Sequence, residues 1–226
     1  QVDSDNRRAF AVGDFNGDHR PDVAFGNGSR VRIGFNDGAG NFGWVNAYEM
    51  RPPVLGVPPN AGGPYELVAA DFDGDDDIDL AGDGNSNTDG SLDIIMNDSG
   101  SFAGLVEVGS GTPQVGWLGT GDLDEDGAPD LIALRAFAGR VDVFLNRAEG
   151  SSFVAGPGCD GGCAMPASAE DAVVADLDHD GHLDLAVASG DGVIIRRGDG
   201  GGRLGVARLW TLPAVVSPAQ DPGDAC

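Results

Sequence analysis

The sequence predicts an all-β protein: a β-propeller built from four-stranded antiparallel blades, with four blades in this chain. Two observations lead to this prediction. An acidic, glycine-containing segment occurs four times, beginning at Asp14, Asp71, Asp122 and Asp176, so the repeat is about 50 residues long. Each acidic segment lies among short apolar segments, and no stretch of ten or more residues has a convincing helical pattern.

The first two strands of each unit flank the acidic segment. The segments before it are 9–12, 67–70, 117–118 and 172–175, and those after it are 23–25, 80–81, 131–134 and 185–188. All are short, apolar and bounded by turn residues, which is typical of strands. We expect residues 1–8 to form a lead and residues 9–226 a single propeller domain, with blades at about 9–51, 65–108, 115–156 and 171–212.

The third strand of each unit alternates between apolar and polar residues, as in Val31, Ile33 and Phe35. This period of two predicts a sheet strand with two different faces. A turn rich in glycine and asparagine follows, and such residues tolerate the positive φ of tight hairpins. After the turn, an apolar residue begins the fourth strand, at Phe42, Phe102, Phe153 and Leu204.

The acidic segment has the chemistry of a cation-binding loop. Each copy has Asp or Asn at positions 1, 3, 5 and 9, and glycine at position 4 or 6. Alternating oxygen side chains on such a turn can converge on one hard cation, and a backbone carbonyl at position 7 would complete the shell. Calcium is the natural candidate because it takes six to eight oxygen ligands in a flexible geometry.

Two other interpretations of the loops are weaker. An EF-hand needs a bidentate glutamate at position 12 and flanking helices, but position 12 holds Phe25, Gly82, Ala133 or Val187. Solvated acidic turns without metal would leave clustered carboxylates to repel one another.

The acidic loop together with the Phe-Gly step at residues 42–43 resembles the FG-GAP repeat of integrin α-subunit propellers, whose bacterial relatives are called VCBS repeats. The resemblance spans roughly residues 9–212 and recurs four times in register. It implies one Ca²⁺ per blade, about four per chain, held between the first two strands. The side-chain ligands that it implies are Asp14, Asn16, Asp18, Asp22; Asp71, Asp73, Asp75, Asp79; Asp122, Asp124, Asp126, Asp130; and Asp176, Asp178, Asp180, Asp184. The carbonyls at position 7 belong to Arg20, Asp77, Ala128 and His182.

Three departures from the family pattern matter. Asn16 removes one charge from the first site, which we expect to weaken it. The first two loops carry glycine at position 4 instead of position 6. Integrin-like propellers have seven blades and this chain shows four, so it closes alone, associates with a second copy, or forms part of a larger ring.

The bulk composition narrows the partners. The net charge of −24 argues against nucleic acid and anionic lipid, and no apolar run is long enough for membrane insertion as a helix. Cys159 and Cys163 could close a small disulfide loop, with Cys226 left over, although free thiols are the alternative. Calcium sites and a disulfide favour a secreted, extracellular or cell-surface setting.

No catalytic constellation is visible. The three histidines all lie inside acidic loops, and the regular carboxylates are assigned to metal. Residues 197–199 spell the Arg-Gly-Asp adhesion tripeptide but occupy a predicted hairpin turn. We therefore expect a non-enzymatic, calcium-binding propeller that acts in protein binding, cell adhesion or structure. The alternatives are a carbohydrate-binding propeller, that is, a lectin, or an accessory domain of a secreted enzyme.

The partner, an extracellular protein or a glycan, is expected at the end of the blades opposite the acidic loops. The connections at that end vary in length and composition while the strands repeat, and variable loops on a repeated scaffold are common binding sites. Tyr65, Arg135 and Arg140 are the candidate contacts there.

Overall fold

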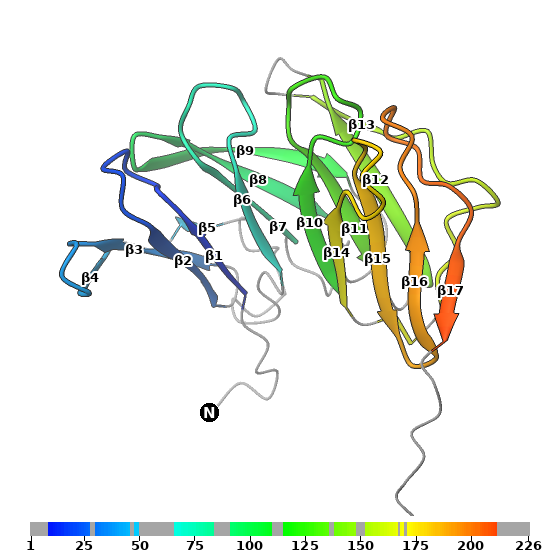
Figure 1. Ribbon diagram of the computed structural model, residues 1–226. Helices are drawn as coiled ribbons and strands as arrows, with labels where there is room; N and C mark the ends of the chain where they lie inside the picture. Colours follow the sequence, from blue (N-terminus) through cyan, green and yellow to red (C-terminus); the bar gives the residue numbers. More distant parts are fainter. Residues whose placement is uncertain are drawn as a thin grey trace, which may run out of the picture.

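The computed structural model describes residues 9–27, 30–45, 48–49, 66–83, 91–109, 115–135, 138–147, 152–166, 168–169 and 171–211. Within these residues the regular elements are β-strands, with no α-helix among them. The strands form four antiparallel sheets, each made of strands consecutive in sequence (Figure 1). The prediction of an all-β protein with four four-stranded blades is confirmed.

The strands of each blade pair in chain order. Their bounds are β1 (Phe10–Gly13), β2 (Asp22–Asn27), β3 (Arg30–Asn36), β4 (Phe42–Trp44) and β5 (Tyr48–Glu49) in blade 1; β6 (Leu67–Ala70), β7 (Asp79–Asp83), β8 (Leu92–Asp98) and β9 (Ser101–Gly109) in blade 2; β10 (Trp117–Gly121), β11 (Asp130–Arg135), β12 (Arg140–Asn146) and β13 (Phe153–Ala155) in blade 3; and β14 (Asp171–Ala175), β15 (Asp184–Ser189), β16 (Gly192–Arg196) and β17 (Arg208–Thr211) in blade 4. The short β5 pairs with β3 beyond the end of β4.

The fourth strand of the last blade differs from the prediction. Leu204 does not begin it; instead β17 starts at Arg208. Leu204 forms isolated bridges with Gly198 and Cys159, and its carbonyl accepts a hydrogen bond from the backbone N–H of Asp160. The backbone of Leu204 is therefore paired with the segment that contains Cys159, and the fourth strand begins four residues later, at Arg208.

The blades pack face to face through apolar residues that alternate along the strands. In blade 1, Ala11, Ala24 and Ile33 lie on one face of the sheet and join a buried cluster with Leu67 and Leu80 of blade 2. Similar clusters lie between blades 2 and 3 and between blades 3 and 4. Because successive side chains of a strand point to opposite faces, one strand can contribute to two such clusters.

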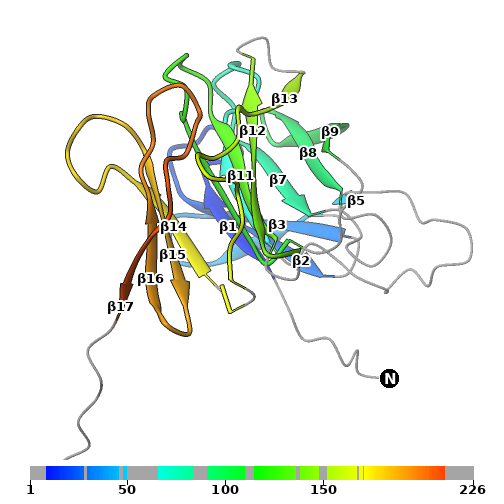
Figure 2. The same cartoon turned by 90° about the vertical axis from the view of Figure 1, so that its right-hand side faces the viewer.

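The innermost strands set the order of the blades. β1 packs beside β6, β6 beside β10, and β10 beside β14. The four sheets therefore follow one another in a row, with blade 1 and blade 4 on opposite sides of the molecule (Figures 1 and 2). Each inner blade is covered on both faces by its neighbours.

The long connection before blade 4 packs against blade 3. The structure pairs Cys159 with Cys163 in a disulfide, and the Cys163 carbonyl accepts a hydrogen bond from the backbone N–H of Val141 in β12. Residues 1–8, Tyr65 and Cys226 lie outside the described residues, so the predictions that concern them stay predictions. None of the described residues belongs to a helix that could cross a membrane.

Candidate metal centres

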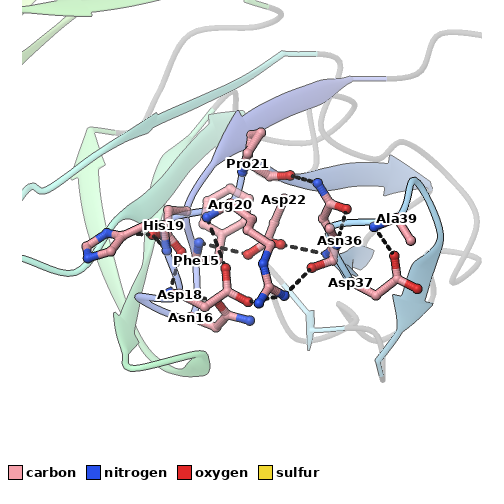
Figure 3. A network of polar contacts seen from close by, with 12 residues as sticks. Phe15, Asn16, Asp18, His19, Arg20, Pro21, Asp22, Asn36, Asp37 and Ala39 are labelled. Atoms are coloured by element: carbon pink, nitrogen blue, oxygen red, sulfur yellow. Dashed lines mark hydrogen bonds and ion pairs between the residues drawn. The ribbon is translucent and has the colours of Figure 1, made fainter.

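The four acidic loops join the first strand of each blade to the second, at the same end as the turn between the third and fourth strands. We call this end the loop rim and the other end the opposite rim. Figure 3 shows the loop of blade 1, where Asp22 lies between Phe15 and Asn36. The four loops fold in the same way, because the same carboxylates accept the same backbone hydrogen bonds.

Position 1 holds the turn of the loop together. Its carboxylate accepts a hydrogen bond from the backbone N–H of position 6 in every copy, from His19 at 2.6 Å, Asp76 at 3.0 Å, Gly127 at 3.0 Å and Gly181 at 3.1 Å. Position 5 accepts one from the N–H of position 7 in every copy, at 2.9–3.0 Å. These bonds satisfy backbone donors that a tight turn would otherwise leave unpaired.

The shift of the glycine between positions 4 and 6 does not change the loop. Both positions have positive φ in every copy. In the first loop Gly17 has φ of 71° and His19 of 63°, whereas in the third Glu125 has 58° and Gly127 has 93°. The backbone therefore needs two left-handed residues, and the sequence provides glycine at one of them and a polar residue at the other.

Position 9 connects the loop to the neighbouring hairpin turn. One oxygen of its aspartate accepts a hydrogen bond from the N–H of position 2, and the other accepts one from the N–H at the end of the third strand. For Asp79 these donors are Phe72 at 2.8 Å and Asn97 at 2.7 Å. Asp22, Asp130 and Asp184 make the same pair of bonds. This role could not be inferred from the sequence pattern, which indicates only an oxygen ligand.

Carboxylates at positions 1, 3 and 9 converge in three of the loops. One oxygen from each lies within 4.8 Å of the other two, and the groups are Asp71, Asp73, Asp79; Asp122, Asp124, Asp130; and Asp176, Asp178, Asp184. The first loop has the same fold but carries Asn16 at position 3, so it brings fewer carboxylates together. The aspartates at position 5 that were predicted as ligands lie outside these three groups and are exposed: Asp75, Asp126 and Asp180.

The three groups fit a cation. The Oδ1 atoms of Asp73, Asp124 and Asp178 are buried, and none has a hydrogen-bond partner. Two unit charges about 4 Å apart repel by roughly 4 kcal/mol at an effective dielectric constant near 20. Three partly buried carboxylates with oxygens within 4.8 Å of one another are unfavourable unless a cation or protons compensate them.

The pKa values of three of these aspartates are raised, which reflects the same unfavourable burial of negative charge. Burial raises the pKa of Asp79 to about 6, although its two backbone hydrogen bonds act to lower it. Asp130, in the equivalent position, has its pKa raised to about 6 by burial against the same opposing bonds. Burial, followed by the neighbouring Asp75, also raises the pKa of Asp73. Oxygen ligands in this arrangement suit a hard divalent cation such as Ca²⁺.

Arginines from the adjacent turns pair with the outer oxygens of position 3. Arg147 lies 2.8 Å from Oδ2 of Asp124, and Arg197 lies 2.5 Å from Oδ2 of Asp178. These contacts leave the Oδ1 atoms inside the loops unpaired. Arg197 belongs to the Arg-Gly-Asp tripeptide, and Gly198 bonds to Asp184, so the tripeptide forms part of the hairpin turn as predicted.

The opposite rim differs from the prediction at one residue. The side chain of Arg135 is only 1% exposed and lies between strands, with its Nε 2.5 Å from Oδ2 of Asp142. Arg135 is therefore a structural residue and not a surface contact. Arg140 pairs with the same aspartate at 2.9 Å but remains 43% exposed. The sequence suggested that Arg135 belongs to an exposed connection after an apolar strand. It is instead the last residue of β11, and its partner Asp142 lies on the neighbouring strand β12.

Residues 14–82 and 122–187, more than half of the chain, match the family described as FG-GAP-like repeat. Among curated proteins no sequence matches the chain significantly. The fold is similar to that of an Agrocybe aegerita lectin that recognises non-reducing terminal N-acetylglucosamine, with 18% identity and a TM-score of 0.58; the alignment covers 90% of this chain and 52% of the lectin.

A second similar structure is the exotype rhamnogalacturonan lyase YesX, with 14% identity and a TM-score of 0.51, over 92% of this chain and 38% of the lyase. The chain thus spans about half the length of the lectin and less of the lyase. At these identities the likeness is one of fold alone.

Proposed function

Since this chain belongs to the FG-GAP-like repeat family, we propose that it is an extracellular calcium-binding β-propeller that binds a partner without catalysing a reaction. The observation that carries the proposal is the convergence of three aspartates, one buried and two partly buried, at equivalent positions of three blades. The remaining loop, in blade 1, has the same hydrogen bonds. It would bind an ion more weakly, through Asp14, Asn16, Asp18 and Asp22.

In each loop, positions 1, 3 and 9 would hold the ion, and position 5 and the carbonyl at position 7 would complete its shell. The bound ion supplies the positive charge that the buried carboxylates lack. Position 9 also joins the loop to the hairpin turn, so the ion would stabilise both segments of the loop rim. Its role in this proposal is structural.

Melting in the presence and absence of chelator tests the calcium proposal. Binding to the folded state alone adds roughly 2.7 kcal/mol per site at a hundredfold excess over Kd. Chelation should therefore lower the melting temperature, and Mg²⁺ should restore it poorly because it requires a tight octahedron. An identical melting curve in chelator and in calcium would contradict the proposal.

A pair of variants tests the site assignment. Asp124→Ala removes a ligand with an orphaned oxygen and should lower the number of bound ions by one. Asp98→Ala is the matched control. Asp98 is an exposed aspartate of the same rim, and it is not a member of any of the three converging aspartate clusters. Equal calcium binding by the two variants would refute the assignment of Asp124.

We place the partner, an extracellular protein or a glycan, at the opposite rim. What supports this is a hollow of about 250 Å³ at that end of blades 2 and 3, lined among others by Gly109, Arg140, Phe144 and Cys163. The partly exposed Arg140 and the apolar Phe144 give it mixed chemistry. A carbohydrate-binding role is the alternative, and secretion to the cell surface is part of either proposal.

A glycan array and a pull-down from extracellular material distinguish the two partner classes. Arg140→Ala should reduce binding, whereas Arg32→Ala, which removes an exposed arginine of β3 in blade 1 that does not line that hollow, should leave it unchanged. If binding were lost only when turns of the loop rim are altered, the partner would bind at the loop rim, and our placement at the opposite rim would be wrong.

A further inference from the structure

The three interfaces between blades repeat one set of contacts. In the first three loops, the residue at position 2 points into the next blade. There it lies in one buried cluster with an apolar residue that follows the turn after the third strand. The pairs are Phe15 with Phe102, whose ring centroids are 5.7 Å apart, Phe72 with Phe153 at 6.0 Å, and Leu123 with Leu204.

A hydrogen bond accompanies each apolar pair. The side-chain amide of Asn97 donates to the carbonyl of Phe15 at 2.9 Å, and that of Asn146 donates to the carbonyl of Phe72 at 2.7 Å. In the last interface the backbone N–H of Gly202 donates to the carbonyl of Leu123 at 2.9 Å. Each interface therefore has a donor side and an acceptor side, and the two sides are different surfaces.

Blade 4 exposes the acceptor side of this interface. Leu177 stands at position 2 of its loop, where Phe15, Phe72 and Leu123 are at most 5% exposed, yet Leu177 is 41% exposed. On the same face of the sheet Val173 is 51% exposed. A hollow of about 390 Å³ lies beside Leu177 and Trp210. Within the described residues, no side-chain amide donates a hydrogen bond to the Leu177 carbonyl.

Blade 1 exposes the donor side. Phe42 begins the fourth strand, in the place of Phe102 and Phe153, and is 39% exposed. Asn36 takes the place of Asn97 and Asn146, and its amide donates to Pro21 of its own loop. The equivalent amides make that same local bond and a second one to the preceding blade. Phe10 and Val12 on this face are 68% and 54% exposed.

We propose that a second copy of this chain covers these two faces, with blade 4 of one copy packing on blade 1 of the other. Leu177 of one copy would meet Phe42 of the other, and Asn36 of that copy would donate to the Leu177 carbonyl. The new interface repeats the three internal ones, so the surfaces match by construction of the repeat. Two such heterologous contacts close a ring of eight blades, within the known range for propellers.

The occupant is a second copy because the chain carries both sides of one interface and they lie at opposite ends of its row of blades (Figure 1). A heterologous pair of surfaces on one molecule leads to head-to-tail association, which ends when the ring closes. Apolar faces of this kind are rarely left open in a soluble protein.

Sedimentation equilibrium of the whole chain in excess calcium tests the proposal. The expected mass is twice the 23.0 kDa of one chain. Leu177→Asp and Phe42→Asp should each weaken association roughly thirtyfold or more, as central apolar contacts do. Val154→Asp, which changes a 40% exposed valine on the outer strand of blade 3, is the control and should stay dimeric.

Mixing the two variants provides the decisive arm. A mixture of Leu177→Asp and Phe42→Asp contains one unaltered interface, formed by blade 4 of the second variant and blade 1 of the first, so a heterodimer should reappear. An unchanged circular-dichroism spectrum and unchanged calcium content would show that each variant is folded, while its melting temperature should fall because association no longer stabilises the folded state. A mass of 23.0 kDa for the unaltered chain at about 100 μM would overturn the proposal, and so would the absence of a heterodimer from the mixture.

Discussion

At the scale of single residues, the aspartate at position 9 is where loop folding and ion binding meet. Asp130 accepts hydrogen bonds from the N–H groups of Leu123 and Asn146 and also belongs to a carboxylate group. Asp124 in the same group accepts no backbone bond within the described residues and pairs only with Arg147. The two aspartates should therefore respond differently to loss of the ion.

We predict that Asp130→Ala destabilises the protein by about 3 kcal/mol even in chelator, because two buried N–H groups lose their acceptor. Asp124→Ala should destabilise the calcium-loaded protein but not the metal-free one, where it removes a repelling charge. Denaturant unfolding of both variants, with and without chelator, measures the difference. Equal losses in chelator would contradict the separate roles.

A second residue-scale prediction concerns pH. Asp79 and Asp130 have folded-state pKa values of about 6, above the ordinary value of 3.8. The metal-free folded state therefore binds protons more tightly than the unfolded state between these values, so their contribution to stability is lost as pH rises through about 6. Metal-free protein should melt at a higher temperature at pH 5 than at pH 7.

Calcium binding should show the opposite trend, because protons compete with the ion for the same oxygens. For a site with a pKa near 6, the apparent Kd should be about tenfold higher at pH 5 than at pH 7. Calcium titrations at the two pH values check this. Stronger binding at the lower pH would contradict the account of Asp79 and Asp130 as ligands.

At the scale of the loop and its flanking strands, the four acidic loops share one backbone conformation although their residues differ. Two left-handed positions are required, and the four copies fill them differently. The sequence pattern alone left this open, since a glycine at position 4 in two loops and at position 6 in the others suggested two conformations. The hydrogen bonds of positions 1 and 5 show that one conformation serves all four.

This requirement predicts the effect of alanine at Gly127. Its φ is 93°, and a Cβ there would meet no heavy atom within 4 Å, so the cost is conformational alone. Gly127→Ala should lower the free energy of unfolding by about 1–2 kcal/mol. Gly43→Ala is the control: this glycine lies in β4 without positive φ, and the nearest atom to an added Cβ is 3.9 Å away.

Strands and loops were predictable because their signals are local. Period-two alternation and turn residues located four strands in each of blades 1 to 3 but missed the short β5. The fourth strand of blade 4 was misplaced, because the Cys159 segment bonds Leu204. The burial of Arg135 was missed for a related reason: its pairing with Asp142 depends on strand register, which no local pattern reveals. In both cases the outcome depends on which segments pair, which a local sequence pattern does not reveal.

At the scale of the whole molecule, four similar blades stand in a row with unlike faces at the two ends. The sequence left open whether they close alone, associate or belong to a larger ring, because the repeat defines each blade but not what covers the ends. The exposed Leu177 and Phe42 favour association through the same contacts that join the blades within the chain. Fold and ion sites do not depend on that association.

The central claim is that the repeated loops are calcium sites, and calorimetric titration of the metal-stripped chain with calcium tests it most directly. The account predicts about four ions per chain, with the loop that contains Asn16 binding more weakly than the other three. A stoichiometry of zero or one would contradict it.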